Sequence, residues 1–459
     1  MIHRYQKKGL NFVLDVNSGA VHLLDDISYA VSGLIDENMT EACPESVVEA
    51  LPQYSADDVR EAYGELYELK KAGQLFAEDD YIDVSRYIPV GAPVKALCLH
   101  VAHDCNLRCK YCFASTGDFG QGRKIMPPEV AKKAIDFVIA RSGKRRNIEV
   151  DFFGGEPLMA WDTVTQTVDY ARSIEEQHGK KFRFTITTNG LLLDEDKRKY
   201  INENMDNCVL SLDGRREVND EFRKTVAGTG SYDTIVPKFK ALVDERDPNL
   251  DYYARGTFTS HNLDFAEDVL SIADAGFDRL SVEPVTADPG CGYDLTEDDL
   301  PKIEAEYDRL TDIMLERKKA GKPFTFFHFM VDLDQGPCVV KRLRGCGAGY
   351  EYVAVTPDGD IYPCHQFVGK EEFKQGSVLD QSFNMDIAQK FAGMNIYSRP
   401  KCQKCWAKFY CSGGCSAANY NMNHDMNDSY DLGCEMERKR LECAIYLKAM
   451  DKICEEEAK

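Results

Sequence analysis

Residues 102–115 read AHDCNLRCKYCFAS, and this stretch decides how the whole chain is interpreted. Cys105, Cys109 and Cys112 follow the spacing C-x3-C-x2-C, and the aromatic Tyr111 directly precedes the last of them. Three thiolates on one short loop can hold a [4Fe–4S] cluster and leave one iron open to a small molecule, whereas four would complete an electron-transfer cluster. A zinc knuckle or three unrelated buried thiols are the alternatives for this stretch taken alone.

Length, charge and cysteine content narrow the class of protein. A chain of 459 residues has room for about three domains. It begins without a signal-peptide pattern and contains no apolar run near the ~20 residues of a membrane span. We therefore expect a cytosolic protein whose 17 cysteines include metal ligands rather than disulfides. The net charge of −21 disfavours nucleic acid as a partner and is compatible with a basic peptide.

The middle of the chain alternates between strand and helix patterns. Strands are predicted at residues 95–105, 147–155, 182–190, 207–214, 251–259 and 277–285, and helices at residues 127–143, 163–179, 232–243 and 265–276. Such a series implies a parallel sheet with right-handed crossovers. Chemistry in these sheets collects at the carboxyl ends of the strands, where the cysteine loop lies.

The cysteine motif and this alternation resemble the radical S-adenosylmethionine (radical SAM) superfamily over residues 94–286. The resemblance implies an α/β fold, a partial (β/α)6 barrel, in which the open iron binds the amino and carboxylate groups of SAM. Gly154, Gly155 and Glu156 match the GGE segment that contacts the SAM amino group in this family. Glycine at these positions lets the backbone approach a ligand closely, although a strand-to-helix turn with a solvated glutamate is the alternative.

Further candidate SAM contacts lie at later strand ends. Ser211 and Asp213 are placed where polar groups can meet a ribose. Arg223 resembles the arginine that pairs with the SAM carboxylate, a role suited to a planar guanidinium. Tyr111 belongs to the same cofactor-binding set, and weaker candidates for the pocket lining are Thr188, Asn189 and Glu283.

A second cysteine constellation occupies the C-terminal third. It comprises Cys346, Cys364, Cys402, Cys405, Cys411, Cys415 and Cys434, with Gly359 five positions before Cys364. This arrangement resembles the SPASM domain at all seven cysteines and implies two auxiliary [4Fe–4S] clusters, with structural zinc as the alternative. By resemblance, one cluster is held by Cys402, Cys405, Cys411 and Cys434. The other is held by Cys346, Cys364 and Cys415, with Cys338 as a candidate fourth ligand.

The first 85 residues belong to neither part. Residues 11–26 contain two alternating segments joined by Asn17-Ser18-Gly19, a β-hairpin signal. Helices are predicted at residues 27–38 and 55–73, the second with Ser55 as N-cap and Gly73 as its end. A hairpin with helices resembles a small winged helix, but its acidity disfavours DNA binding. Beside a radical SAM–SPASM enzyme it resembles the element that binds a precursor peptide as an added strand, with a structural cap as the alternative.

The whole chain resembles the SCIFF-peptide maturases, which form thioether bridges in cysteine-rich precursor peptides. The segments NFVLDVNSGAVHLLDD (residues 11–26) and GCGAGYEYVAVTPDGDIYPCHQFVG (residues 345–369) carry this resemblance. It implies a peptide-recognition domain over residues 1–85, a barrel over 94–320 and a SPASM domain over 335–459. It also implies SAM, three [4Fe–4S] clusters, a ribosomal precursor peptide, a flavodoxin or ferredoxin as electron donor, and an anaerobic organism. The alternatives are another SPASM-type peptide or protein modification and a non-enzymatic zinc or peptide-binding module.

Overall fold

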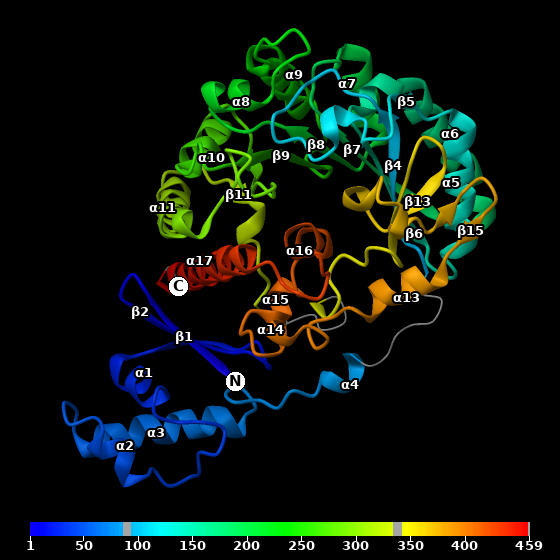
Figure 1. Ribbon diagram of the computed structural model, residues 1–459. Coiled ribbons are helices and arrows are strands. Elements are labelled where there is room, and N and C mark those ends of the chain that lie inside the picture. The colour runs from blue at the N-terminus through cyan, green and yellow to red at the C-terminus, as the bar shows by residue number, and fades with distance from the viewer. Residues whose placement is uncertain (86–92, 334–341, 458–459) are drawn as a thin grey trace.

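The computed structural model describes residues 1–85, 93–333 and 342–457 (Figure 1). Its core is a curved parallel sheet built from the six predicted strands: β4 (Ala96–His103), β6 (Asn147–Gly154), β7 (Lys181–Thr188), β8 (Asn207–Ser211), β9 (Asp251–Phe258) and β10 (Arg279–Pro284). The short strand β11 (Thr325–Phe326) extends one edge, also in parallel. Every residue of β4 is buried, as expected of a central strand with both faces covered.

Helices cover the outer side of this sheet (Figure 1). They are α5 (Pro128–Arg141), α6 (Trp161–His178), α7 (Glu195–Asn204), α8 (Arg216–Phe222), α9 (Tyr232–Asp244), α10 (Phe265–Asp274) and α11 (Leu300–Lys319). The four predicted helices are present, and α5 begins with proline as expected. The sequence analysis did not predict α7, α8 or α11. Their apolar residues face the sheet, but α7 and α11 are mostly polar, which hides the helical pattern.

The C-terminal part continues the same sheet rather than forming a separate one. Strand β12 (Tyr352–Val355) pairs in parallel with β4. The antiparallel strands β13 (Asp360–Tyr362), β14 (Gly376–Ser377) and β15 (Ser382–Phe383) follow, and β5 (Lys124–Ile125) pairs with the end of β4. The helices α13 (Met385–Gly393), α14 (Pro400–Gln403), α15 (Lys408–Cys411), α16 (Ser416–Asn423) and α17 (Asp431–Glu457) lie across the open side of the barrel (Figure 1).

The N-terminal domain contains the predicted hairpin together with a strand that was not predicted. Strands β1 (Ile2–Lys7), β2 (Leu10–Asp15) and β3 (Val21–Leu24) form an antiparallel sheet in that order. Gly19 has a φ of 75°, as the turn requires. Helices α1 (Asp26–Ser32), α2 (Glu45–Glu49) and α3 (Ala56–Lys71) pack on it, and the short α4 (Ile82–Ser85) follows.

Two details of these helices test the sequence analysis. The Ser55 side chain accepts a hydrogen bond from the Asp58 N–H, which confirms the predicted N-cap of α3. The predicted helix over residues 27–38 was wrong in its extent, because α1 ends at Ser32 and Gly33 caps it. Glycine favours a helix end over continuation of the helix.

The N-terminal domain packs firmly on the C-terminal part. Val16 shares a buried apolar cluster with Cys402 and Phe409. The His3 ring stacks on Trp406 with centroids 3.7 Å apart. Lys408, which is 3% exposed, donates to Asp79 at 2.7 Å. The domain is therefore a structural neighbour of the C-terminal cysteines rather than a tethered appendage. Within the described ranges, no helix is long and apolar enough to span a bilayer.

Candidate active site

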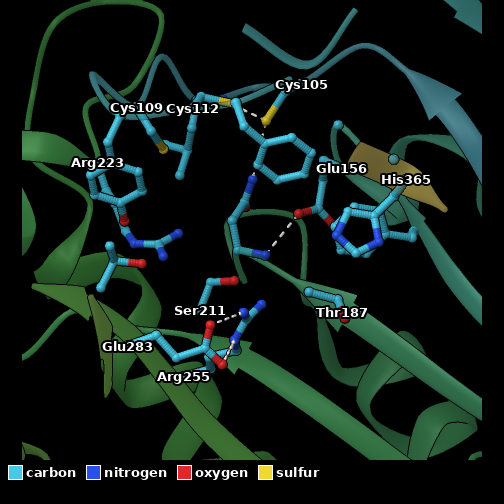
Figure 2. A pocket seen from close by; sticks show the side chains of 18 of the residues that line it. Cys105, Cys109, Cys112, Glu156, Thr187, Ser211, Arg223, Arg255, Glu283 and His365 are labelled. Atoms are coloured by element: carbon cyan, nitrogen blue, oxygen red, sulfur yellow. Dashed lines mark hydrogen bonds and ion pairs between the residues drawn. The ribbon is translucent and has the colours of Figure 1, made fainter. Parts of the chain in front are cut away.

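The cysteine loop leaves the carboxyl end of β4 and forms one wall of a cavity of about 240 Å³. Cys105, Cys109 and Cys112 all line it, so the structure brings together the three cysteines that the motif predicted (Figure 2). The backbone of Arg108 and Lys110 pairs with residues 222–224, through bonds of 2.7 Å to Lys224 O and 3.1 Å to Phe222 O. These bonds hold the loop against the segment that carries Arg223.

Gly154 and Gly155 place the end of β6 directly against the cysteine loop. The Gly155 N–H donates to Ala102 O at 2.7 Å, and the Glu156 N–H donates to Asp104 O at 2.9 Å. A Cβ on Gly154 would overlap the Ala102 carbonyl oxygen, and one on Gly155 would overlap that of Asp104. The glycines are therefore required for the close approach of the two backbones.

The Glu156 carboxylate is committed to hydrogen bonds within the protein. It accepts from Asn189 N at 2.8 Å, Thr188 Oγ1 at 2.8 Å and Leu158 N at 3.0 Å. Burial raises the pKa of Glu156 to about 7 despite these three donors. Glu156 lines the cavity as predicted, and its carboxylate braces the ends of β6 and β7.

Arg223 lies beside the cysteines with its guanidinium directed into the cavity (Figure 2). Its Nε lies 3.0 Å from Asp213 Oδ1. Asp213 also accepts from Tyr111 Oη at 2.5 Å and from the Thr257 N–H at 3.1 Å. Burial alone would lower the pKa of Arg223, but the Asp213 carboxylate raises it above its ordinary value. Arg223 is thus a fixed cation that Asp213 and Tyr111 hold in place.

This geometry corrects the expectation for Asp213. The residue is fully buried and its oxygens are occupied by Tyr111, Arg223 and Thr257, so it orients Arg223 and does not face a ribose. Ser211, two residues earlier on β8, does line the cavity. Thr188 and Asn189 combine both predicted roles: they line the cavity and form the turn after β7, and Asn189 Nδ2 lies 3.6 Å from Cys105 Sγ.

Several side chains of the cavity wall were not predicted, among them Arg255, His365 and Phe113. Arg255 on β9 makes a bidentate ion pair with Glu283 on β10, one arm of which is a 3.2 Å hydrogen bond from Nε. Burial raises the pKa of Glu283, but Arg255 brings it below its ordinary value, so this wall is ionic. His365 and Phe113 contribute rings 5.5 Å apart. Arg255 could have been found from the sequence, because it lies on the fifth predicted strand. His365 could not, because it reaches the cavity from the C-terminal part of the chain.

A second cavity of about 540 Å³ adjoins the first. The two share wall residues, among them Cys112, Phe113 and His365. This second cavity, the outer one, lies between the cysteine loop and residues of α16 such as Tyr420. Phe113 is 47% exposed and lies at the junction, so the inner cavity continues outward past an aromatic side chain.

The C-terminal cysteines fall into the two sets expected from their order. Cys402, Cys405, Cys411 and Cys434 line one cavity of about 370 Å³, between α14, α15 and the start of α17. Cys346, Cys364 and Cys415 interact electrostatically with one another: Cys346 and Cys415 each raise the pKa of Cys364, after the larger effect of burial. Cys338, the candidate fourth ligand of this set, lies outside the described residues.

Two observations bear on what the three cysteine groups could bind. No three His, Cys, Asp or Glu side chains among residues 1–85, 93–333 and 342–457 lie close enough to hold one metal ion. Burial raises the pKa of Cys105, Cys109, Cys364 and Cys411 to about 12, so these thiols need bound cations to ionise at neutral pH.

The cysteines outside the motifs differ in burial. All cysteines of the described chain are free, so no disulfide competes for the ligand sets. Cys98, Cys208 and Cys443 are buried within the apolar cores, whereas Cys291 and Cys454 are exposed.

Comparison with known proteins agrees with this site. A model of the Radical SAM superfamily matches residues 99–250, and a model of the SPASM iron-sulfur cluster-binding domain matches residues 346–406. The chain therefore contains a radical SAM domain followed by a SPASM domain, on a mixed α/β fold with a parallel sheet at its core.

Similar proteins are named for several different activities. The cysteine-type anaerobic sulfatase-maturating enzyme of Clostridium novyi is 25% identical, covering 72% of this chain and 90% of the relative. The mycofactocin maturase MftC of Mycolicibacterium smegmatis is 26% identical, covering 72% and 79%.

Solved structures show the same fold. Native anSMEcpe with bound AdoMet superposes with a TM-score of 0.63 at 19% identity, covering 79% of this chain and 100% of that one. Streptococcus suis SuiB bound to the precursor peptide SuiA gives a TM-score of 0.53 at 17% identity, covering 93% and 97%.

Proposed function

We propose that this protein is a radical SAM enzyme that forms thioether bonds between cysteine sulfur and a carbon of another residue in a ribosomally made, cysteine-rich peptide. The observation that carries the proposal is the cavity in which Cys105, Cys109 and Cys112 meet Arg223 and the Gly154–Gly155 backbone. Relatives named as maturases and a fold neighbour bound to a precursor peptide support a peptide substrate.

The residues of the cavity divide the work of holding the cofactors. Cys105, Cys109 and Cys112 would hold a [4Fe–4S] cluster, Arg223 would pair with the SAM carboxylate, and Ser211 would contact the ribose; all five residues line the cavity. Together, the reduced cluster and SAM supply a radical that removes a hydrogen atom from the substrate. The cavity continues past Phe113, where a polypeptide segment would enter and cover the reacting groups.

The auxiliary sites match the electron balance of thioether formation. Joining S–H and C–H groups is a two-electron oxidation: hydrogen abstraction removes one electron with a proton, and the thiol proton and a second electron must also leave. The set of Cys346, Cys364 and Cys415 adjoins the reaction cavity through His365, which directly follows Cys364. Clusters held by this set and by the set in α14–α17 would accept the second electron, and a flavodoxin or ferredoxin would supply the low-potential electron for SAM cleavage.

The N-terminal sheet offers one open edge for the precursor peptide. Side chains of β1 contact the C-terminal part, where His3 bonds to Glu442 at 2.9 Å and stacks on Trp406. Strand β3, at the other edge, has no second strand partner within the described chain, and its Leu23 is 42% exposed. A peptide added to β3 gains main-chain hydrogen bonds, while alternate side chains supply specificity.

A substitution at this edge tests recognition separately from chemistry. Leu23→Glu places a charge at the open edge and is expected to weaken precursor binding at least tenfold, while SAM cleavage without peptide stays at the native rate. Leu34→Glu is the matched control, because Leu34 is 45% exposed in the same domain but lies in the turn after α1. Equal peptide affinity of both variants and the native protein would exclude β3 as the docking edge.

Deletion of the whole N-terminal domain is a poorer test. Val16 shares a buried cluster with Cys402 and Phe409, so removing residues 1–83 would expose the segment that carries auxiliary ligands. A loss of activity in the deletion variant could therefore come from lost peptide recognition or from a less stable auxiliary cluster.

The central experiment is anaerobic incubation of the reconstituted enzyme with SAM, reductant and a short cysteine-rich precursor peptide. Thioether formation removes two hydrogens per bridge and one alkylatable thiol per bridge, which mass spectrometry detects. A carbon–carbon link removes the hydrogens but leaves the thiols, and oxidation of a single cysteine leaves no link between residues. Either result would support the other SPASM-type modifications; colourless protein with stoichiometric zinc would exclude the enzyme.

A further inference from the structure

Arg399 is a buried arginine tied to the segments that carry both auxiliary cysteine sets. It is 3% exposed and directly precedes α14, where its carbonyl accepts from the Cys402 N–H at 3.0 Å. Its Nη1 donates to Gly413 O at 2.8 Å, in the loop between Cys411 and Cys415. Its Nη2 donates to Ser416 Oγ at 3.0 Å, and its Nε to Met426 O at 3.3 Å.

The charged groups that act on this guanidinium are thiols rather than carboxylates. Burial lowers the pKa of Arg399, and the charged groups that oppose this effect are all cysteines: Cys402, Cys411, Cys415 and Cys346, two from each set. No Asp or Glu of the described chain forms an ion pair with it. Because arginine keeps its proton in proteins, it is a buried cation that needs an anion, and an uncompensated buried charge costs several kcal/mol.

The backbone around Arg399 is shaped to receive it. Gly413 has a φ of 86°, and a Cβ at this position would overlap Arg399 Nη1. The two hydrogen bonds from Nη1 and Nη2 fix the guanidinium plane against residues 413–416. The guanidinium charge therefore has a fixed position beside segments that carry cysteines of both sets.

We propose that Arg399 is a positioning residue shared by the two auxiliary iron–sulfur sites, where its charge compensates both thiolate-bound clusters and raises both reduction potentials. The inference rests on the proposed function, since it requires that both cysteine sets hold clusters. Net charge and hydrogen bonds to the sulfurs are among the factors that set cluster potentials, and a nearby cation stabilises the more negative, reduced form. Both auxiliary sites thereby stay reducible as electron acceptors.

The test is a redox titration of the reconstituted full-length protein, followed by electron paramagnetic resonance, with iron content measured in parallel. In Arg399→Gln we expect both auxiliary signals to move to lower potential. A tenfold fall in the reduced-to-oxidised ratio at fixed potential corresponds to a shift of about 59 mV for one electron. Arg399→Lys, which keeps the charge, should restore most of the shift.

Arg438 provides the matched control. Its Nη1 contacts Cys405 Sγ at 3.9 Å, in one set only, and Glu435 already balances its charge. Arg438→Gln should therefore change the signal of that set alone, and by less.

The outcomes separate this inference from the proposed function. Native protein without auxiliary iron would contradict the proposed function itself. Iron-replete Arg399→Gln with unchanged potentials, or with a shift in one cluster only, would overturn the shared role. Loss of iron from Arg399→Gln is a separate outcome. If Arg399→Lys then retains iron, the result supports charge compensation. If both variants lose iron, the hydrogen-bond geometry alone maintains the sites, and charge compensation is overturned.

Discussion

Replacing Arg223 by glutamine removes the cation that we assign to the SAM carboxylate and keeps a side chain of similar length. Arg223 lines the cavity beside the cysteine loop, with its Nε 3.0 Å from Asp213 Oδ1. Asp213 is fully buried but still accepts from Tyr111 Oη and Thr257 N after the substitution. The cavity should therefore lose the positive charge of Arg223 but keep that of Arg255, and folding is checked in parallel because Asp213 loses its cation.

The expected magnitude follows from the lost interaction with the SAM carboxylate. A hydrogen bond to a charged group contributes about 1.5–3 kcal/mol. Since about 1.4 kcal/mol is tenfold in Kd, SAM binding should weaken by about 10- to 100-fold. Arg223→Lys should lie between the two, because lysine keeps the charge but not the planar fork.

The assay is anaerobic titration calorimetry of SAM into reconstituted protein of equal iron content. Arg216→Gln is the control, since Arg216 lies on the same helix α8 but is exposed and pairs with Asp233 at the surface. A folded, iron-replete Arg223→Gln protein that binds SAM within threefold of the native Kd would refute the assignment.

Three further perturbations test the site. Burial raises the pKa of Glu156 from 4.5 to about 7, so the folded state holds this proton more tightly; the stability it contributes is present at low pH and lost as the pH rises through 7. At ~1.36 kcal/mol per pKa unit, the shift corresponds to about 3 kcal/mol of unfolding free energy. In Glu156→Gln, the free energy of unfolding by urea should change less between pH 5 and 7 than in the native protein. An unchanged pH dependence would assign the effect to other groups. Gly155→Ala should cost about 1–3 kcal/mol in thermal unfolding and lower the iron bound by the cysteine loop, because its Cβ meets the Asp104 carbonyl. Gly64→Ala is its control, with no atom within 4 Å of the new Cβ. Cys411→Ala should remove the resonance signal of its own auxiliary set and leave SAM cleavage intact; loss of every cluster signal would contradict separate sites.

Most features that were predicted correctly depend on residues that lie close together in the sequence. The six strands, the turn at Gly19 and the Ser55 cap depend on side-chain periodicity or on the conformation of a few neighbouring residues, so a short stretch specifies each. The three-cysteine loop is equally local. The two C-terminal sets followed from resemblance, and the structure gathers one of them in a single cavity.

Long-range contacts account for what the sequence analysis missed. Strand β1 reads as a polar segment, yet Tyr5 and Lys7 are buried because α17 covers that face, as the Lys7–Cys443 contact at 3.3 Å shows. Asp213 looked like a ligand contact, since nothing in its neighbourhood along the chain reveals that Tyr111 and Arg223 occupy its oxygens. Arg399 carries no motif, and its environment exists only where the two cysteine sets meet.

The sequence by itself determined the parallel α/β core, the positions of the thiols and the order of the domains, because periodicity and ligand spacing are written in consecutive residues. Only the tertiary structure decided that β12 joins the barrel sheet, that His365 closes the reaction cavity from the C-terminal part, and that the N-terminal sheet rests on the segment around Cys402. These arrangements depend on which buried surfaces and charges compensate one another across long stretches of chain, and spacing along the sequence carries no record of that pairing.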